Sequence, residues 1–167
     1  MYVSSIIIAR METLPRISRI AALLLLMVLC QAAAAIAADA STQEQAIIDA
    51  VKRANGLETE YWAHPDAYPT WEALYGHYRT GYSTTIAERM TDYTLTEEGD
   101  PATWVPEQVH VAGFDGDSAV AWFRTPPEFG EEGTWGFEPF MIVRLHREDG
   151  RWVIYWATDS ATPPPAP

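Results

Sequence analysis

The fold of this chain is decided by the stretch FMIVRLHREDGRWVIYWAT, residues 140–158. Two runs rich in β-branched and aromatic residues flank Asp149-Gly150, the dipeptide that favours a two-residue type I′ turn. The stretch is therefore predicted to form a β-hairpin with strands over 140–146 and 151–158. A two-residue turn sets the register, and the pairs that it predicts on one face are Leu145 with Ile154, Val143 with Trp156, and Arg147 with Trp152.

This face of the hairpin is large and apolar, so we expect it to meet the helices of the domain. The opposite face is expected to be the solvated one. Its predicted pairs are Arg144 with Tyr155, His146 with Val153, and Ile142 with Ala157. The hairpin thus predicts an antiparallel sheet with one covered side.

A second hairpin is predicted upstream, where residues 109–114 and 118–125 flank Asp115-Gly116-Asp117. One of its faces is expected to carry Val109, Val111, Val120, Trp122 and Arg124, and the other Ala112, Phe114, Ala119, Ala121 and Phe123. Because both faces are mainly apolar, we expect this hairpin to be central in the sheet or covered on both sides. Residues 126–138, which contain prolines and glycines, are predicted to form a long loop or an irregular strand.

Helices are predicted before the strands. Ser41-Thr42-Gln43-Glu44 matches a capping box, and apolar residues at helical spacing follow it, so a first helix is expected over 42–62. Pro65 prevents its continuation, and Gly56, which costs roughly 1 kcal/mol relative to Ala, is a point where it could break. Two more helical stretches are predicted, one from Pro69-Thr70 to Gly81 and one from Thr85 to about Tyr93.

The first forty residues differ from the rest of the chain. Arg16 and Arg19 precede a strongly apolar core over residues 20–29, and the Ala-rich stretch 32–38 follows it. These are the parts of a secretory signal peptide. A membrane anchor would need about 20 apolar residues, and this core is too short. We therefore predict a signal peptide over residues 1–37, cut after Ala37, and export to a periplasm or to the extracellular space.

Two details of this segment bear on its processing. Met11 begins a more normal signal peptide than Met1, so residues 1–10 are interpreted as an upstream start. Cys30 is the only cysteine, and the large Leu29 before it argues against lipoprotein anchoring at that position. The exported domain is then expected to have no disulfide and to fold on its core alone. No membrane span is expected in it.

The order of helices and strands, together with the ending Gly150-Arg151-Trp152-Val153-Ile154-Tyr155-Trp156, resembles the nuclear-transport-factor-2-like superfamily, which includes SnoaL-like and ketosteroid-isomerase-like proteins. The resemblance covers roughly residues 42–160. It implies an α+β fold of a single domain, residues 38–160, in which N-terminal helices pack in the concave face of a curved antiparallel sheet, a cystatin-like cone. Residues 161–167 are expected to be a Pro-rich disordered tail.

Candidate binding residues are the aromatic side chains that could line such a cone. Seven tryptophans and eight tyrosines are many for this length, and core packing is the simpler explanation for any one of them. Those selected as ligand-binding candidates are Trp62, Tyr78, Tyr82, Trp104, Trp122, Trp135 and Trp156. A general base, if the domain is catalytic, would have to be His64, His110 or Asp159, because no acidic residue lies inside a predicted strand.

Other chemistries have little support. The histidines are far apart and form no metal-binding motif, so no metal and no cofactor is expected. A formal net charge of −12 argues against nucleic acid as a partner.

Three functions stay open. The leading hypothesis is an exported, non-catalytic domain that binds a small apolar or aromatic ligand or a protein partner. The alternatives are a SnoaL-like isomerase, dehydratase or cyclase acting outside the cytoplasm, and a structural or assembly module of the envelope. A homodimer formed through the sheet is compatible with each of them.

Overall fold

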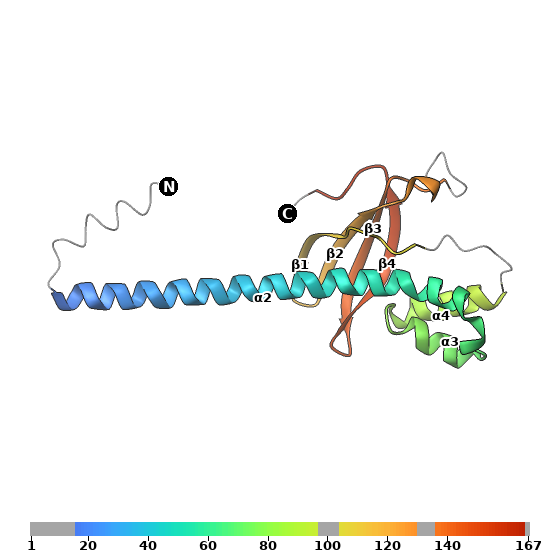
Figure 1. Ribbon diagram of the computed structural model, residues 1–167, viewed down its shortest axis with the longest axis horizontal. Helices are drawn as coiled ribbons and strands as arrows, with labels where there is room; N and C mark the ends of the chain where they lie inside the picture. Colours follow the sequence, from blue (N-terminus) through green and yellow to red (C-terminus); the bar gives the residue numbers. More distant parts are fainter. Residues whose placement is uncertain (1–15, 97–103, 130–135, 166–167) are drawn as a thin grey trace. The chain divides into compact units, whose positions relative to one another are not determined.

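The computed structural model describes residues 16–96, 104–129 and 136–165 of the chain. Within these ranges helices come first and four strands follow (Figure 1). The chain divides into two compact units, residues 1–42 and 43–167, and the sheet and its core belong to the second. The α+β class predicted from the sequence is confirmed, with three helices packed against an open antiparallel sheet of four strands.

The first helix, α2, runs Arg16–Ala63 and ends where the sequence predicts. Its start is not at residue 42: the Thr42 hydroxyl donates to the carbonyl oxygen of Ala38 at 2.9 Å, a bond within a continuous helix. The expected capping box is therefore wrong, because the alanines that precede it are strong helix formers and carry the helix through. Gly56 does not break the helix either.

Two further helices match the sequence closely. After the short 3₁₀ turn η1, Pro65–Ala67, helix α3 runs Trp71–Tyr78. It is capped by Thr70, whose side chain accepts a hydrogen bond from the backbone N–H of Ala73 at 3.2 Å. Helix α4 runs Thr84–Thr96, from one residue before the predicted start to three residues beyond the predicted end.

The sheet consists of β1 His110–Asp115, β2 Ser118–Arg124, β3 Phe140–Glu148 and β4 Arg151–Ser160, in the order β1-β2-β3-β4. All neighbouring strands are antiparallel, as expected for two successive hairpins. Asp149 and Gly150 have φ values of 51° and 76°, which confirms the type I′ turn between β3 and β4. Residues 127–129 form a second 3₁₀ turn, η2 Pro127–Phe129, in the connection before β3.

A β-bulge at Tyr155 changes the faces of the last strand. Leu145 pairs with Ile154 and Arg147 with Trp152, as predicted, but Arg144 pairs with Trp156 and Val143 with Ala157. Tyr155 is the extra residue, and it moves every later side chain of β4 to the other face. The predicted pairs of Val143 with Trp156, Arg144 with Tyr155 and Ile142 with Ala157 are therefore wrong, and Trp156 is 40% exposed instead of meeting the helices.

A second bulge, at Ala112, changes the faces on which the side chains of β1 lie. Val111 pairs with Ala121, so it shares a face with the buried Ala119 and Phe123 and not with Trp122. Val109 packs into the same buried cluster. The expected location of this hairpin is also wrong, since β1 is an edge strand and one face of the sheet is open.

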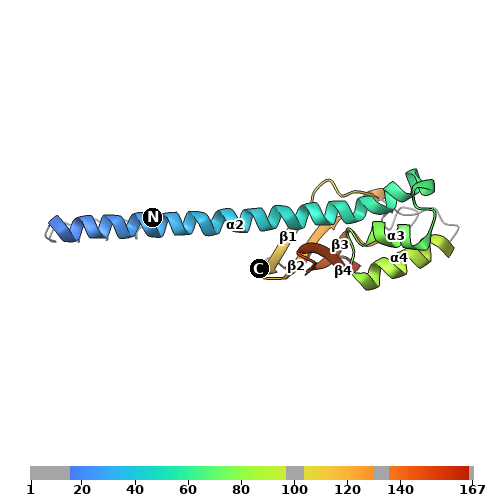
Figure 2. The ribbon, with the colours of Figure 1, turned by 90° about the horizontal axis from the view of Figure 1, so that it is seen from below.

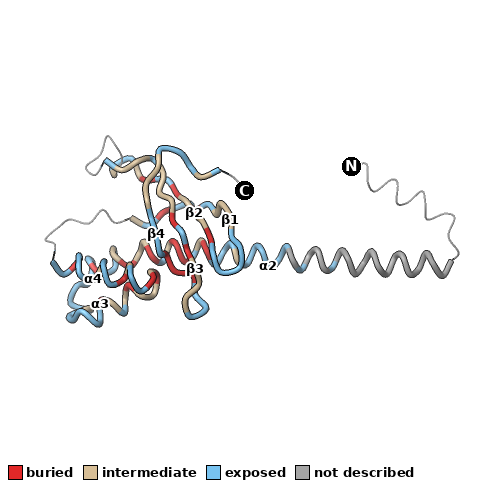
Figure 3. Tube along the Cα trace, turned by 180° about the vertical axis from the view of Figure 1, so that it is seen from behind, coloured by how far each residue is buried: buried red, intermediate tan, exposed pale blue. Residues whose placement is uncertain are grey.

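The core lies between α2 and one face of the sheet, the inner face (Figures 1 and 3). Ile47, Ala50, Val51 and Ala54 of α2 pack there against the sheet. The other members of this cluster are Val109, directly before β1, and the strand residues Ala119, Ala121, Phe123, Val143, Leu145, Trp152 and Ile154. The expectation that this face of the final hairpin meets the helices is confirmed, since Val143, Leu145 and Ile154 share the cluster with these residues of α2.

A second buried cluster joins the three helices. It contains Leu57 and Tyr61 of α2, Leu74 and Tyr78 of α3, and Ala87 of α4. Figure 2 shows α3 and α4 beside the last turns of α2. Tyr61 and Tyr78 thus pack against other helices. Within the described part of the chain, no helix has the length and apolar character needed to cross a bilayer.

Candidate functional site

A small cavity of about 180 Å³ lies between α2, the connection from α3 to α4, and the inner face of the sheet. We call it the inner cavity. Its walls are largely apolar, and Ala157, an exposed residue, stands at its opening. The lining residues are Asn55, Tyr82, Trp104, Phe123, Phe137, Met141, Val143, Ile154 and Ala157.

One polar atom of this lining is buried without a partner. The indole N–H of Trp104 makes no hydrogen bond within the described residues, although it is shielded from solvent. A buried donor left unpaired costs about 1–3 kcal/mol. Such a group in a native structure requires an explanation, and a bound acceptor is one.

Aromatic rings hold Trp104 in place. Its ring stacks on Phe129 with centroids 4.8 Å apart and planes at 21°. Phe123 meets it edge-on at 6.3 Å, and Phe137 lies 6.2 Å away. Phe137 is itself fixed by its backbone N–H, which donates to the carbonyl oxygen of Phe129 at 3.0 Å. Residues from the β2–β3 connection and from β2 thus build one wall of the inner cavity.

The backbone fixes Tyr82 at the opposite wall. The N–H of Ile154 donates to the carbonyl oxygen of Gly81, and the N–H of Ser83 donates to that of Ile154, both at 2.9 Å. These bonds form a parallel bridge between Tyr82 and Ile154, at the point where the bulge interrupts β4. Burial, together with the nearby charge of Glu58, raises the pKa of the Tyr82 hydroxyl, so it stays protonated and can donate.

Asn55 supplies a third polar group to the inner cavity. Its side-chain N–H donates to the carbonyl oxygen of Val51 at 2.8 Å, one turn earlier in α2. That bond orients the carboxamide and leaves its oxygen as an acceptor for a ligand. The lining therefore combines apolar walls with a few polar groups, those of Trp104, Tyr82 and Asn55, which is the composition of a small-molecule site.

A carboxyl group lies close to this site without lining it. Glu58 of α2 borders a separate hollow of about 250 Å³, which Arg89 and Met90 of α4 also line. Burial raises the pKa of Glu58. It also raises the pKa of Tyr78 and Tyr82, and the charge of Glu58 adds to both increases. Glu58 is not among the residues selected from the sequence, because a carboxylate in an amphipathic helix has no feature that marks it as half-buried.

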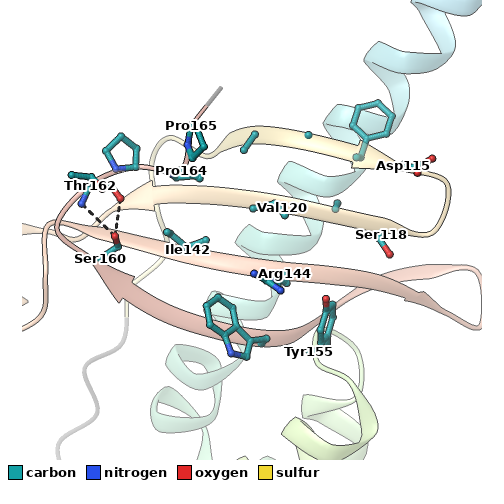
Figure 4. A pocket seen from close by; sticks show the side chains of 16 residues that line it. Asp115, Ser118, Val120, Ile142, Arg144, Tyr155, Ser160, Thr162, Pro164 and Pro165 are labelled. Atoms are coloured by element: carbon teal, nitrogen blue, oxygen red, sulfur yellow. Dashed lines mark hydrogen bonds between the residues drawn. The ribbon is translucent and has the colours of Figure 1, made fainter. Parts of the chain in front are cut away.

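The open face of the sheet, the outer face, carries a larger and shallower groove of about 740 Å³ (Figure 4). We call it the outer groove. Strands β1 to β4 form its floor, and tail residues Thr162–Pro165 lie along it. Aromatic and cationic side chains alternate on this face. The guanidinium of Arg144 lies 4.9 Å from the Trp156 ring, and His146 stacks on Tyr155 at 4.7 Å.

The structure divides the aromatic candidates among different places. Tyr82 and Trp104 meet at the inner cavity, and Trp156 lines the outer groove. Tyr78 is fully buried and belongs to the helix cluster. Trp122 stacks on His110 on the outer face, and Trp62 is 38% exposed near the end of α2. Trp135 falls outside the described residues.

None of the three candidate bases lines the inner cavity. His64 is exposed after α2. The His110 ring lies against Trp122 on the outer face, with centroids 4.2 Å apart. Asp159 accepts a hydrogen bond from the backbone N–H of Glu138 at 3.1 Å, which is a structural contact between β4 and the start of β3. In the described ranges no group of three potential metal ligands gathers either.

No protein-family model, curated protein or solved structure matches this chain. The properties of its cavity and sheet are therefore the basis for a functional proposal.

Proposed function

We propose that this chain is an exported, non-catalytic binding domain that holds a small aromatic ligand in the inner cavity. The observation that carries the proposal is the indole N–H of Trp104, which is buried beside apolar walls and has no hydrogen-bond partner among the described residues. A ligand with a hydrogen-bond acceptor would satisfy this donor. The rings around Trp104 would face the apolar part of the ligand.

The size of the cavity limits the ligand. Dry apolar cavities of about 150 Å³ are known to take up benzene, and the inner cavity has about 180 Å³. A single ring with a short carbonyl substituent fits a space of this size. We therefore propose neutral aromatic carbonyl compounds as the ligand class, with Tyr82 as a second donor and the Asn55 oxygen as an acceptor.

A matched pair of probes tests this proposal. Acetophenone and α-methylstyrene have nearly the same shape, but only acetophenone has an oxygen acceptor. Calorimetric titration should show acetophenone binding about fivefold to tenfold more tightly, the equivalent of one net hydrogen bond of about 1–1.4 kcal/mol. Trp104→Phe should remove this preference while α-methylstyrene still binds. If neither probe binds, or if Trp104→Phe leaves the preference intact, the proposal is wrong.

The location and fold family belong to the same proposal. Export is supported by the arginines, short apolar core and alanines of residues 16–38. Membership of the nuclear-transport-factor-2-like superfamily, and its cone, is supported by the order of helices and strands and by a cavity between helix and sheet. Mass spectrometry of protein from the full coding sequence should find an N-terminus close to Ala38; a chain that keeps residues 16–29 would contradict export by cleavage.

A SnoaL-like isomerase, dehydratase or cyclase is the second candidate, and Glu58 is the observation that favours it. Its raised pKa and its effect on the pKa of Tyr82 are what a general base near a hydrogen-bond donor requires. Glu58 lines the neighbouring hollow, however, and not the inner cavity. Turnover of a carbonyl substrate that Glu58→Gln abolishes would favour the enzyme over the binding domain.

A further inference from the structure

We propose that the outer groove is a binding site for an extended proline-rich peptide, and that the chain's own C-terminal tail is its intramolecular occupant. This site is distinct from the inner cavity, because it lies on the opposite face of the sheet. The observation that carries the proposal is the path of Thr162–Pro165, which line the same groove as Trp156 and Arg144 (Figure 4).

The floor of the outer groove has the chemistry that such a peptide needs. Grooves that recognise proline-rich segments are lined by aromatic rings, against which the pyrrolidine rings pack. Here Trp156 and Tyr155 stand on β4, next to the apolar Ile142 and Val120 of the two central strands. Arg144 lies over the Trp156 ring and holds that indole against the sheet.

The tail is directed into the groove by a local turn. The Ser160 hydroxyl donates to the carbonyl oxygen of Thr162 at 2.8 Å and accepts from the Thr162 N–H at 3.3 Å. These two bonds, drawn in Figure 4, reverse the chain at the end of β4. Pro163, Pro164 and Pro165 then line the groove.

The composition of the tail suits this position. Residues 161–167 contain four prolines and no charged side chain. Consecutive prolines favour the polyproline II helix, which needs no internal hydrogen bonds and loses little conformational entropy on binding. A neutral segment also avoids repulsion from a chain whose formal net charge is −12.

The outer groove extends beyond the tail. Figure 4 shows Thr162, Pro164 and Pro165 near one end, and Ser118 and Tyr155 toward the other. A proline-rich segment of a partner protein could therefore enter at the end that Ser118 and Tyr155 mark and displace the tail. In that arrangement the tail is an autoinhibitory contact, and its removal exposes the full site.

The test uses a fluorescently labelled peptide with the sequence of residues 160–167, SATPPPAP, and protein expressed from the full coding sequence. Fluorescence anisotropy measures peptide binding to the full chain and to a chain that ends at Ala161. A tethered tail acts at an effective concentration on the order of 1 mM. The shortened chain should therefore bind the peptide at least fivefold more tightly than the full chain.

Two controls separate specific recognition of the proline-rich peptide from nonspecific binding. A peptide in which Pro163, Pro164 and Pro165 are replaced by alanine should bind the shortened chain at least tenfold more weakly. Trp156→Ala should weaken binding. Trp62→Ala should not, because Trp62 is exposed to a similar degree (38% against 40%) but lies near the end of α2, outside the groove. Arg144→Gln provides a second floor variant should Trp156→Ala fail to fold, and it should also weaken binding.

Equal affinity of the peptide for both chains, or equal affinity of the proline and alanine peptides, would overturn the proposal. The acetophenone experiment does not bear on this proposal. Trp104 lies on the other face of the sheet, so the effect of Trp104→Phe on acetophenone binding tests the inner cavity alone.

Discussion

Gly81 lies so close to Ala54 that a Cβ atom added to the glycine would be 2.7 Å from the Cα of Ala54. This contact brings the connection between α3 and α4 against α2. It also allows the carbonyl oxygen of Gly81 to accept the N–H of Ile154 on β4. One missing side chain thus lets a loop reach the sheet and present Tyr82 to the inner cavity.

Gly81→Ala should destabilise the protein by about 2–3 kcal/mol, because the added methyl group meets backbone that cannot move aside. Gly76→Ala is the matched control. Gly76 lies inside α3 with nothing within 4 Å of an added Cβ, so alanine should stabilise the helix by about 0.5–1 kcal/mol. Urea denaturation of both variants measures the difference. A neutral Gly81→Ala would show that the loop does not need this close approach.

The ion pair between Arg79 and Glu148 should make stability depend on pH. The two groups are 2.6 Å apart and join the end of α3 to the β3–β4 hairpin. Burial alone would raise the pKa of Glu148, but hydrogen bonds from His146 and Arg79 and the charges of both lower it below its usual value. A lowered folded-state pKa stabilises the fold above the unfolded value of about 4.3, and this contribution is lost as the pH falls.

Glu148→Gln should therefore cost about 1–2 kcal/mol at pH 7 and progressively less below pH 4. Glu44→Gln, which changes an exposed carboxylate in α2, should have little effect at either pH. Denaturant titrations at pH 7, 5 and 3 give the comparison. If Glu148→Gln costs the same free energy of unfolding at pH 3 and pH 7, the charge of Glu148 is not what stabilises the fold.

The buried pair of Tyr78 and Thr94 should show strong coupling. Their hydroxyl groups are 3.0 Å apart, and burial raises the pKa of Tyr78 to about 12 even though the bond to Thr94 opposes the shift. Tyr78→Phe or Thr94→Val each leaves the other hydroxyl buried and unpaired, at a cost of about 1–3 kcal/mol. The double variant should cost at least 1 kcal/mol less than the sum of the singles. Simple additivity in this double-mutant cycle would contradict the pairing.

Much of this fold follows from the sequence, because its elements have clear periods and turns. The dipeptide Asp149-Gly150 predicts the last hairpin, and Thr70 predicts the start of α3. The predicted strand register is wrong where one extra residue is inserted into a strand. Tyr155 and Ala112 are bulge residues, yet a tyrosine in a strand is ordinary β composition, and nothing local distinguishes it from its neighbours. Each bulge reverses the faces of the residues beyond it.

The candidate site was predictable only in part. Tyr82 and Trp104 were selected as aromatic residues that could line a cone, and both line the inner cavity. Asn55 and Met141 were missed, because a polar residue in a helix and a methionine in a strand become cavity walls only through tertiary packing. The tail was expected to be disordered from its prolines, and its path along the outer face depends on the turn at Ser160.

Ala157 gives access to the inner cavity from an exposed position. It faces inward opposite Val143 because of the bulge, lines the cavity, and remains exposed. Ala157→Phe should place a ring across the opening and reduce acetophenone affinity at least tenfold, while stability changes by less than about 0.5 kcal/mol, as is usual for surface positions. Thr158→Phe, one residue further on the opposite face, should leave binding intact. If Ala157→Phe binds the probe normally, the ligand enters elsewhere or the cavity is not its site.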